Sequence, residues 1–151
     1  MTNSKKFLLI ALIGTYLLAF VMNVMPAIKH PDLNVSISDL ITSVLFGFLL
    51  LMYSKTGSKK LRIVSIVGIF SGVVICIIHH FESVMSVNPF LNAIASLQYP
   101  LYAIFTIPFF GGNLFFDINY GTYSLYLSLF YGVVLGLSIY FKKRDFNGQI
   151  R

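Results

Sequence analysis

Four stretches of the chain are apolar for long enough to cross a membrane as helices. A spanning helix needs about 20 mostly apolar residues. The four stretches cover residues 7–25, 35–53, 61–78 and 123–141. Lys5 and Lys6 precede the first stretch and Pro26 follows it. The pattern predicts an all-α integral membrane protein, a single membrane domain built as a bundle of four transmembrane helices.

The segment between the third and fourth stretches, residues 83–120, is apolar but interrupted. Its central part, Asn92–Phe110, is long enough to span, yet it contains Gln98, Pro100 and Pro108. Proline removes a backbone donor and disfavours helix in the residue before it, so the residues before Pro100 and Pro108 are the two expected break points. Broken backbone is tolerated at membrane depth only when it packs against protein. We therefore expect a re-entrant or interfacial hairpin on the outer side, with a fifth span as the alternative.

The same segment is rich in phenylalanine. An apolar segment outside a bundle is expected to enter the outer leaflet or to cover something, and sticky aromatic patches often bind partners. The predicted aromatic surface comprises Phe90, Phe105, Phe109, Phe110, Phe115 and Phe116.

Composition supports a membrane location. Hydrophobic residues make up 57% of the chain and charged residues 11%, against about 25% charged in soluble domains. One small core cannot hide that much apolar surface, so the surplus must face lipid. The preference for Lys over Arg, together with abundant Ile, Phe and Asn and no Trp, is typical of an AT-rich bacterial genome.

The basic residues predict the orientation, because cytosolic loops carry an excess of Lys and Arg. With four spans, only Lys29 lies outside, and both termini and the tail 142–151 are cytosolic. A fifth span would instead place the basic cluster after residue 141 outside. The ten inner basic residues form three clusters: Lys5 and Lys6; Lys55, Lys59, Lys60 and Arg62; and Lys142, Lys143, Arg144 and Arg151.

These clusters flank apolar runs and form no basic face, so the net charge of +6 does not indicate nucleic-acid binding. Four of the five acids (Asp32, Asp39, Glu82 and Asp117) lie outside in the same arrangement. The first stretch exceeds the roughly 7–15 apolar residues of a signal peptide and no small-residue cleavage site follows it. It is therefore expected to remain as a span.

Small residues recur at four-residue spacing on every span. Helices in lipid associate by close backbone approach between such residues, so the stripes predict a packed bundle rather than a chemistry. Alternatively, the small residues could line a permeation path. The grooves that they form along the helices could face other spans of this chain or another subunit. The stripes are Ala11, Thr15, Ala19 and Asn23; Ser43 and Gly47; Gly68, Gly72, Cys76 and His80; and Ser124, Ser128, Gly132 and Gly136.

Motifs for catalysis are missing from the sequence. There is no GxSxG, HExxH, P-loop or dinucleotide fingerprint, and we expect no cofactor. No span holds an acid or base near its middle, where proton relays and coupling-ion sites usually lie. The single cysteine, Cys76, excludes an intramolecular disulfide and a CxxC motif.

Polar residues gather instead at the predicted outer ends of the spans: Asn23, Asp39, His79, His80 and Glu82. The spacing His79-x-x-Glu82 places an imidazole and a carboxylate on one helical face, where they could share a proton or bind a metal. Asp39 would complete a three-ligand set. The simpler interpretation is a hydrated helix end, and we assign no metal.

Asp39 also has a structural interpretation. Ser36-x-x-Asp39 before an apolar run is typical of a capping box, with the carboxylate near the positive end of the helix.

Three functions remain open. The first is a non-enzymatic accessory subunit or an immunity-type protein, acting through contacts with membrane lipids and with a membrane protein partner or a second copy. The second is a small oligomeric channel or transporter. The third is a membrane enzyme with an outer-face site of His79, His80, Glu82 and Asp39.

Overall fold

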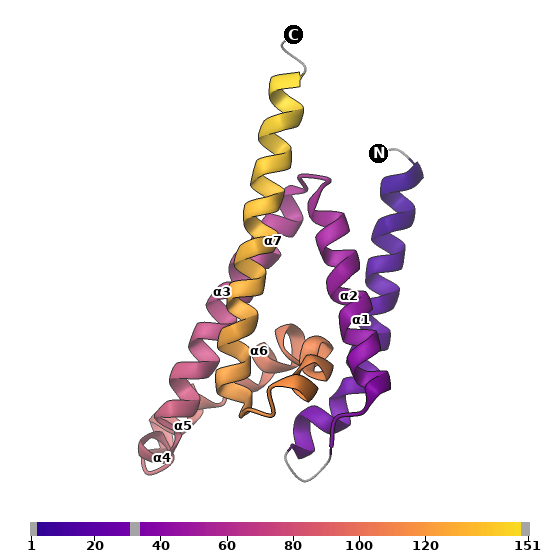
Figure 1. Ribbon diagram of the computed structural model, residues 1–151. Helices are drawn as coiled ribbons and strands as arrows, with labels where there is room; N and C mark the ends of the chain where they lie inside the picture. Colours follow the sequence, from indigo (N-terminus) through magenta and orange to yellow (C-terminus); the bar gives the residue numbers. More distant parts are fainter. Residues whose placement is uncertain (1–2, 31–33, 149–151) are drawn as a thin grey trace.

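The computed structural model describes the backbone of residues 3–30 and 34–148, with side chains as far as Arg144. This part of the chain is helical and contains no strand. Four long helices are joined by shorter ones, as Figure 1 shows. The elements are α1 (Asn3–Lys29), α2 (Ile37–Ser54), α3 (Lys59–His80), α4 (Glu82–Met85), α5 (Pro89–Ala95), α6 (Gln98–Phe105), the 3₁₀ helix η1 (Ile107–Phe115) and α7 (Tyr120–Gly148).

The four long helices confirm the predicted all-α membrane bundle. Each is long and apolar enough to cross a bilayer. Within an apolar stretch of 18 residues in each helix, only 17% to 39% of the residues are buried inside the chain. The remaining apolar surface must face lipid or another protein, because water would not tolerate it on this scale.

Two helices extend beyond their predicted bounds. α1 continues through Pro26 to Lys29, since a proline inside a helix removes one backbone hydrogen bond without necessarily ending the helix. α7 runs to Gly148, so residues 142–148 of the predicted tail continue the last helix. At 1.5 Å per residue α7 is about 43 Å long, which exceeds the roughly 30 Å hydrocarbon core.

The long helices form two pairs, α1 with α2 and α3 with α7 (Figure 1). The pairs diverge from the turn between α2 and α3, and α6 and η1 lie between them at the wider end. The turn contains Gly57 at φ 62°, a left-handed conformation that favours glycine. A Cβ on Gly57 would also lie 3.1 Å from Cβ of Lys142, so the turn packs directly on α7.

The two ends of the bundle differ in charge. The beginning of α1, the α2–α3 turn and the end of α7 lie at the same end, which brings the basic clusters together (Figure 1). We call this the basic end. The opposite end, which we call the outer end after its predicted orientation, holds the start of α2, the end of α3 and the start of α7, with Asp39, Glu82 and Asp117.

Residues 81–119 leave the bundle at the end of α3 and rejoin it at the start of α7, at the same end of the molecule. The rings of His79, at the end of α3, and Tyr120, at the start of α7, lie 4.3 Å apart. Between them the chain bends by 80° where α6 meets η1. The segment thus makes no net crossing. We call α6 and η1 together the hairpin, because the segment that contains them begins and ends at the same end of the bundle.

The breaks in this segment follow the prolines only in part. η1 begins at Ile107, which is the predicted second break. The first break lies earlier than Tyr99, because α5 ends at Ala95 and α6 begins at Gln98. Pro100 occupies the first turn of α6. A backbone N–H in the first turn has no acceptor within the helix, so proline removes no helical hydrogen bond there.

α3 and α7 pack along a narrow seam. The buried residues of α3 alternate in spacing between four and three, as in helices that supercoil gently around each other. At Gly68 a Cβ would lie 2.7 Å from the Tyr131 ring, and at Gly72 it would overlap the backbone oxygen of Ser124. Ser124 and Ser128 thus contact Gly72, so this part of the α7 stripe packs on α3.

Gly132 and Gly136 do not lie in this seam. A Cβ at either position would meet nothing within 4 Å. The physical reason is the helical period: each four-residue step turns the stripe by about 40°. Gly132 is therefore about 80°, and Gly136 about 120°, away from the direction of Ser124. The buried face of α7 continues instead through Tyr131, Val134 and Ser138.

Candidate functional site

The five polar residues predicted to gather at the outer end occupy separate places. Asp39 caps α2, Asn23 lies inside the bundle, and His79 and Glu82 pair at the end of α3. His80 is exposed beside them, with its ring 5.0 Å from that of Phe81 and perpendicular to it. The sequence identified the polar residues and the His79–Glu82 pair, but not the separation of Asp39 and Asn23 from that pair.

Asp39 forms the predicted capping box with Ser36, which confirms its structural interpretation. The backbone N–H of Ser36 donates to Asp39 Oδ2 at 2.8 Å, and the backbone N–H of Asp39 donates to Ser36 Oγ at 3.3 Å. The three-ligand set with His79 and Glu82 is wrong. Among the described residues no group of three His, Cys, Asp or Glu side chains is placed to bind a metal.

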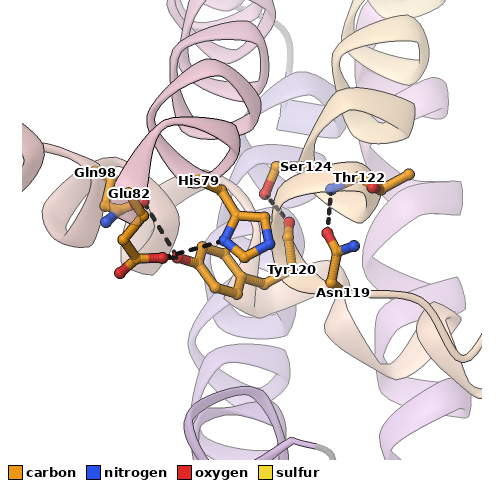
Figure 2. Close-up of polar contacts among 7 residues, drawn as sticks. All are labelled: His79, Glu82, Gln98, Asn119, Tyr120, Thr122 and Ser124. Atoms are coloured by element: carbon orange, nitrogen blue, oxygen red, sulfur yellow. Dashed lines mark hydrogen bonds and ion pairs between the residues drawn. The ribbon is translucent and has the colours of Figure 1, made fainter. Parts of the chain in front are cut away.

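His79 and Glu82 form the predicted pair, and the fold adds two further residues to it. His79 Nδ1 lies 3.3 Å from Glu82 Oε2. The Tyr120 hydroxyl lies 3.1 Å from the same Glu82 oxygen and 3.4 Å from Gln98 Oε1. Figure 2 shows these side chains converging from α3, α4, α6 and α7. We call these four residues the outer polar cluster.

Backbone contacts hold the outer polar cluster in place. Asn119 caps α7 by accepting from the Thr122 N–H at 2.9 Å, and Ser124 Oγ donates to the Tyr120 carbonyl at 2.7 Å (Figure 2). Gly121 lets α7 approach α3, since a Cβ there would lie 2.6 Å from the His79 ring. Gln98 is fully buried, whereas the side chains of His79 and Glu82 are 30% and 45% exposed.

Chemically, the outer polar cluster can share a proton between imidazole and carboxylate and can fix the hairpin to the ends of two spans. Its exposed acid and base lack the enclosure by which active sites strengthen electrostatic interactions. The arrangement therefore suits a hydrated helix end that ties α3, α6 and α7 together.

Asn23 anchors the hairpin from α1. Its amide donates to the carbonyl of Ala19 at 2.7 Å and to Ser43 Oγ on α2 at 3.0 Å. Ser43 Oγ in turn donates to the Pro108 carbonyl and accepts from the Gly111 N–H, both at 3.1 Å. Gly111 itself is in tight contact with α2, because a Cβ there would lie 2.7 Å from the backbone nitrogen of Leu40.

The spans satisfy the irregular backbone of the hairpin with side-chain hydroxyls. Five carbonyls of the hairpin accept such bonds, which is how broken helices persist away from water. The donors come from all four spans. They are Ser71 to Leu101 at 3.4 Å, Tyr16 to Ile104 at 3.2 Å, Tyr131 to Phe105 at 3.1 Å, Ser43 to Pro108 at 3.1 Å and Tyr123 to Phe109.

The predicted aromatic surface is divided by the fold. Phe109 and Phe110 are buried in the core at 6% and 0% exposure. Phe109 packs on Phe46 of α2, with ring centroids 4.7 Å apart. Phe90, Phe115 and Phe116 remain exposed. η1 is therefore mainly an internal element, whereas of α6 only Gln98 is buried.

The fold also forms a pair that the sequence did not indicate. His30 Nε2 lies 3.2 Å from Asp117 Oδ1, beside a hollow of about 380 Å³ that Asn34 and Asn113 also line. The two partners are separated by 87 positions, so no local pattern connects them. Asp117 adopts φ 47°, which asparagine and aspartate tolerate better than most residues.

Two apolar grooves remain where the hairpin does not fill the space between the helix pairs. The lateral groove, about 540 Å³, lies between α2 and α7 over η1 and is open to the side. The deep groove, about 390 Å³, is more enclosed and is lined by α1, α2, α3, α6 and α7. Neither groove was predicted from the sequence.

No family model, curated protein or solved structure matches this chain. The evidence for its function is therefore the arrangement of its own residues.

Proposed function

We propose that this chain is a non-enzymatic, multi-pass protein of the cell membrane that binds a transmembrane helix of a partner protein, as an accessory subunit or an immunity-type protein. The observation that supports the proposal best is the lateral groove. It is open to the side, apolar throughout, and placed between two spans.

The lining of the lateral groove suits a helix. Ser43, Gly47 and Gly112 contribute small side chains to the groove, and Phe48 and Tyr126 border it. Transmembrane helices associate mainly by close packing where small residues permit approach. Bulky side chains of a partner helix would enter the groove and exchange contacts with lipid for contacts with protein.

Two features argue against the other functions. An oligomeric channel needs polar groups along its path, but five hairpin carbonyls already accept hydrogen bonds from the spans. An outer-face enzyme built on His79, His80, Glu82 and Asp39 would need these residues together, and Asp39 caps its own helix.

The proposed orientation places both termini and the basic end in the cytosol, as the positive-inside rule predicts. Val87 and Lys55 are exposed at opposite ends of the bundle and allow a test. In a Cys76→Ser background, Val87→Cys should react with a membrane-impermeant thiol reagent in intact cells. Lys55→Cys should react only after permeabilisation. The reverse pattern would invert the topology.

Partner binding can be tested with a photo-crosslinking amino acid at Phe48. Phe48 lines the lateral groove and is 58% exposed, whereas Phe70 on α3 is 65% exposed and does not line it. In the native membrane, Phe48 should give one discrete protein adduct, identifiable by mass spectrometry, and Phe70 should give none.

A groove-filling Val44→Trp change should abolish the Phe48 adduct, with the protein still accumulating in the membrane. Equal crosslinking at Phe48 and Phe70 would contradict a specific groove. An adduct with a second copy of this chain, together with ion flux in liposomes, would favour the channel instead.

A further inference from the structure

The deep groove runs from the hairpin toward the basic end. Ile104 and Phe105 of α6 border it at the hairpin. Tyr16 and Phe46 line it at the same level, because the Tyr16 hydroxyl donates to the Ile104 carbonyl and the two rings lie 5.5 Å apart. Along the spans the groove continues to residues one to two turns nearer the basic end. These include Leu9, Tyr53 and Lys60.

The lining of the deep groove is almost entirely apolar, because the hydroxyls of Tyr16 and Tyr131 at the hairpin end already donate to backbone carbonyls. At the basic end, Lys60 is the charged residue of the described lining. Lys60 belongs to the cluster of Lys55, Lys59 and Arg62 around the α2–α3 turn. A long apolar cavity with a cation at its opening complements an amphiphile with an anionic head.

Shape distinguishes this groove from the lateral one. Side chains from five elements line it and make it more enclosed than the lateral groove, so it is less suited to a whole helix of about 10 Å diameter. Its volume of about 390 Å³ falls in the range of roughly 300–1,000 Å³ that is typical of small-molecule sites. A single flexible hydrocarbon chain fits this enclosure, and it can enter from the surrounding lipid.

We propose that the deep groove binds one acyl chain of an anionic phospholipid, with the phosphate of its headgroup at Lys60. Anionic lipids attract basic residues beside a membrane, and a cluster of Lys and Arg such as this one indicates binding of anionic lipids. The site requires only that the four helices span a bilayer, and it is independent of the partner proposed for the lateral groove.

The experiment measures lipid retention by the full-length protein in a neutral detergent, using native mass spectrometry. Phosphatidylglycerol and phosphatidylcholine with identical acyl chains are compared. We expect one phosphatidylglycerol to be retained at concentrations where phosphatidylcholine is not. Inorganic phosphate should not compete, because it lacks the chain that occupies the groove.

Two matched pairs of variants test the two halves of the site. Lys60→Gln should weaken phosphatidylglycerol retention about fivefold, and Lys59→Gln, which removes the same charge outside the groove, should not. Val64→Trp, which fills the groove, should abolish retention. Ile63→Trp, at an exposed position outside the groove, should leave it unchanged.

Three results would overturn the proposal. Equal retention of both lipids would show that the headgroup is not recognised. Equal effects of Lys60→Gln and Lys59→Gln would indicate general surface attraction rather than a site. Retention that survives Val64→Trp would place the lipid elsewhere.

Discussion

The two halves of this bundle are held together by different interactions. In the outer half, the hairpin lies between the helix pairs, and buried Asn23, Ser43, Gln98 and Asn113 make hydrogen bonds there. In the basic half, the two pairs meet at the α2–α3 turn, which packs on α7, and the deep groove continues between them as far as Tyr53 and Lys60.

The difference teaches what stabilises a bundle in lipid. Lipid is as apolar as leucine, so burying one more leucine between helices gains little. Satisfying the backbone of a broken segment gains much more, because an unsatisfied group in hydrocarbon costs several kcal/mol. The hairpin therefore ties the two helix pairs together in the outer half, and the space that it leaves unfilled toward the basic end can take a ligand.

The largest expected effect is at the contact between the hairpin and α2. Gly111→Ala would drive a Cβ into the backbone of Asp39 and Leu40. Overpacking typically costs about 1–3 kcal/mol, and backbone has less freedom to yield than a flexible side chain. Thermal unfolding in detergent should show a clear loss of stability. An unchanged melting temperature would mean that the hairpin does not pack on α2 as described.

A smaller effect is expected from a single hydroxyl. Tyr123→Phe removes the donor to the Phe109 carbonyl and leaves that carbonyl buried. Interhelical hydrogen bonds in membranes average about 0.6 kcal/mol, with values up to about 1.7, and the loss should fall in that range. Tyr126→Phe, at a 47% exposed position on the same helix, is the control and should be neutral. Equal losses would remove the distinction between buried and exposed hydroxyls.

The smallest effect is expected on the outward-facing part of α7. Gly132→Leu meets open space and should change the unfolding free energy by no more than about 0.5 kcal/mol. Gly68→Leu, whose Cβ would lie 2.7 Å from the Tyr131 ring, is the matched substitution in the seam and should be severe. A severe effect at Gly132 in the membrane but not in detergent would reveal a contact with another chain.

The sequence by itself determined the spans, the charge asymmetry of their ends and the cap of α2. These features are local: a run of apolar residues, a cluster of lysines, or Ser36 three positions before Asp39. Local energetics decide them, since each run must be long enough for the bilayer and each helix start must satisfy its own N–H groups.

Two groupings suggested by the sequence are not found among the described residues, for a geometric reason. Gly132 and Gly136 follow Ser124 and Ser128 in the sequence, but a strict four-residue stripe turns away from a straight contact. Similarly, Asp39 and His79 lie at the same end of the bundle but do not belong to one site. Periodicity indicates a face, and it does not indicate which neighbour that face meets.

Only the tertiary structure decided how the hairpin is held and where the grooves lie. The hydroxyl of Tyr16 and its acceptor at Ile104 are 88 positions apart, and Ser43 and Pro108 are 65 apart. Tyr16 and Tyr131 lie near the middle of spans, where a buried hydroxyl needs a hydrogen-bond acceptor. Their positions were therefore the signal in the sequence that an acceptor lies nearby. The acceptors themselves appear only when Pro108 and its neighbours break the helix and fold back between the spans, because a regular helix would have used those carbonyls internally.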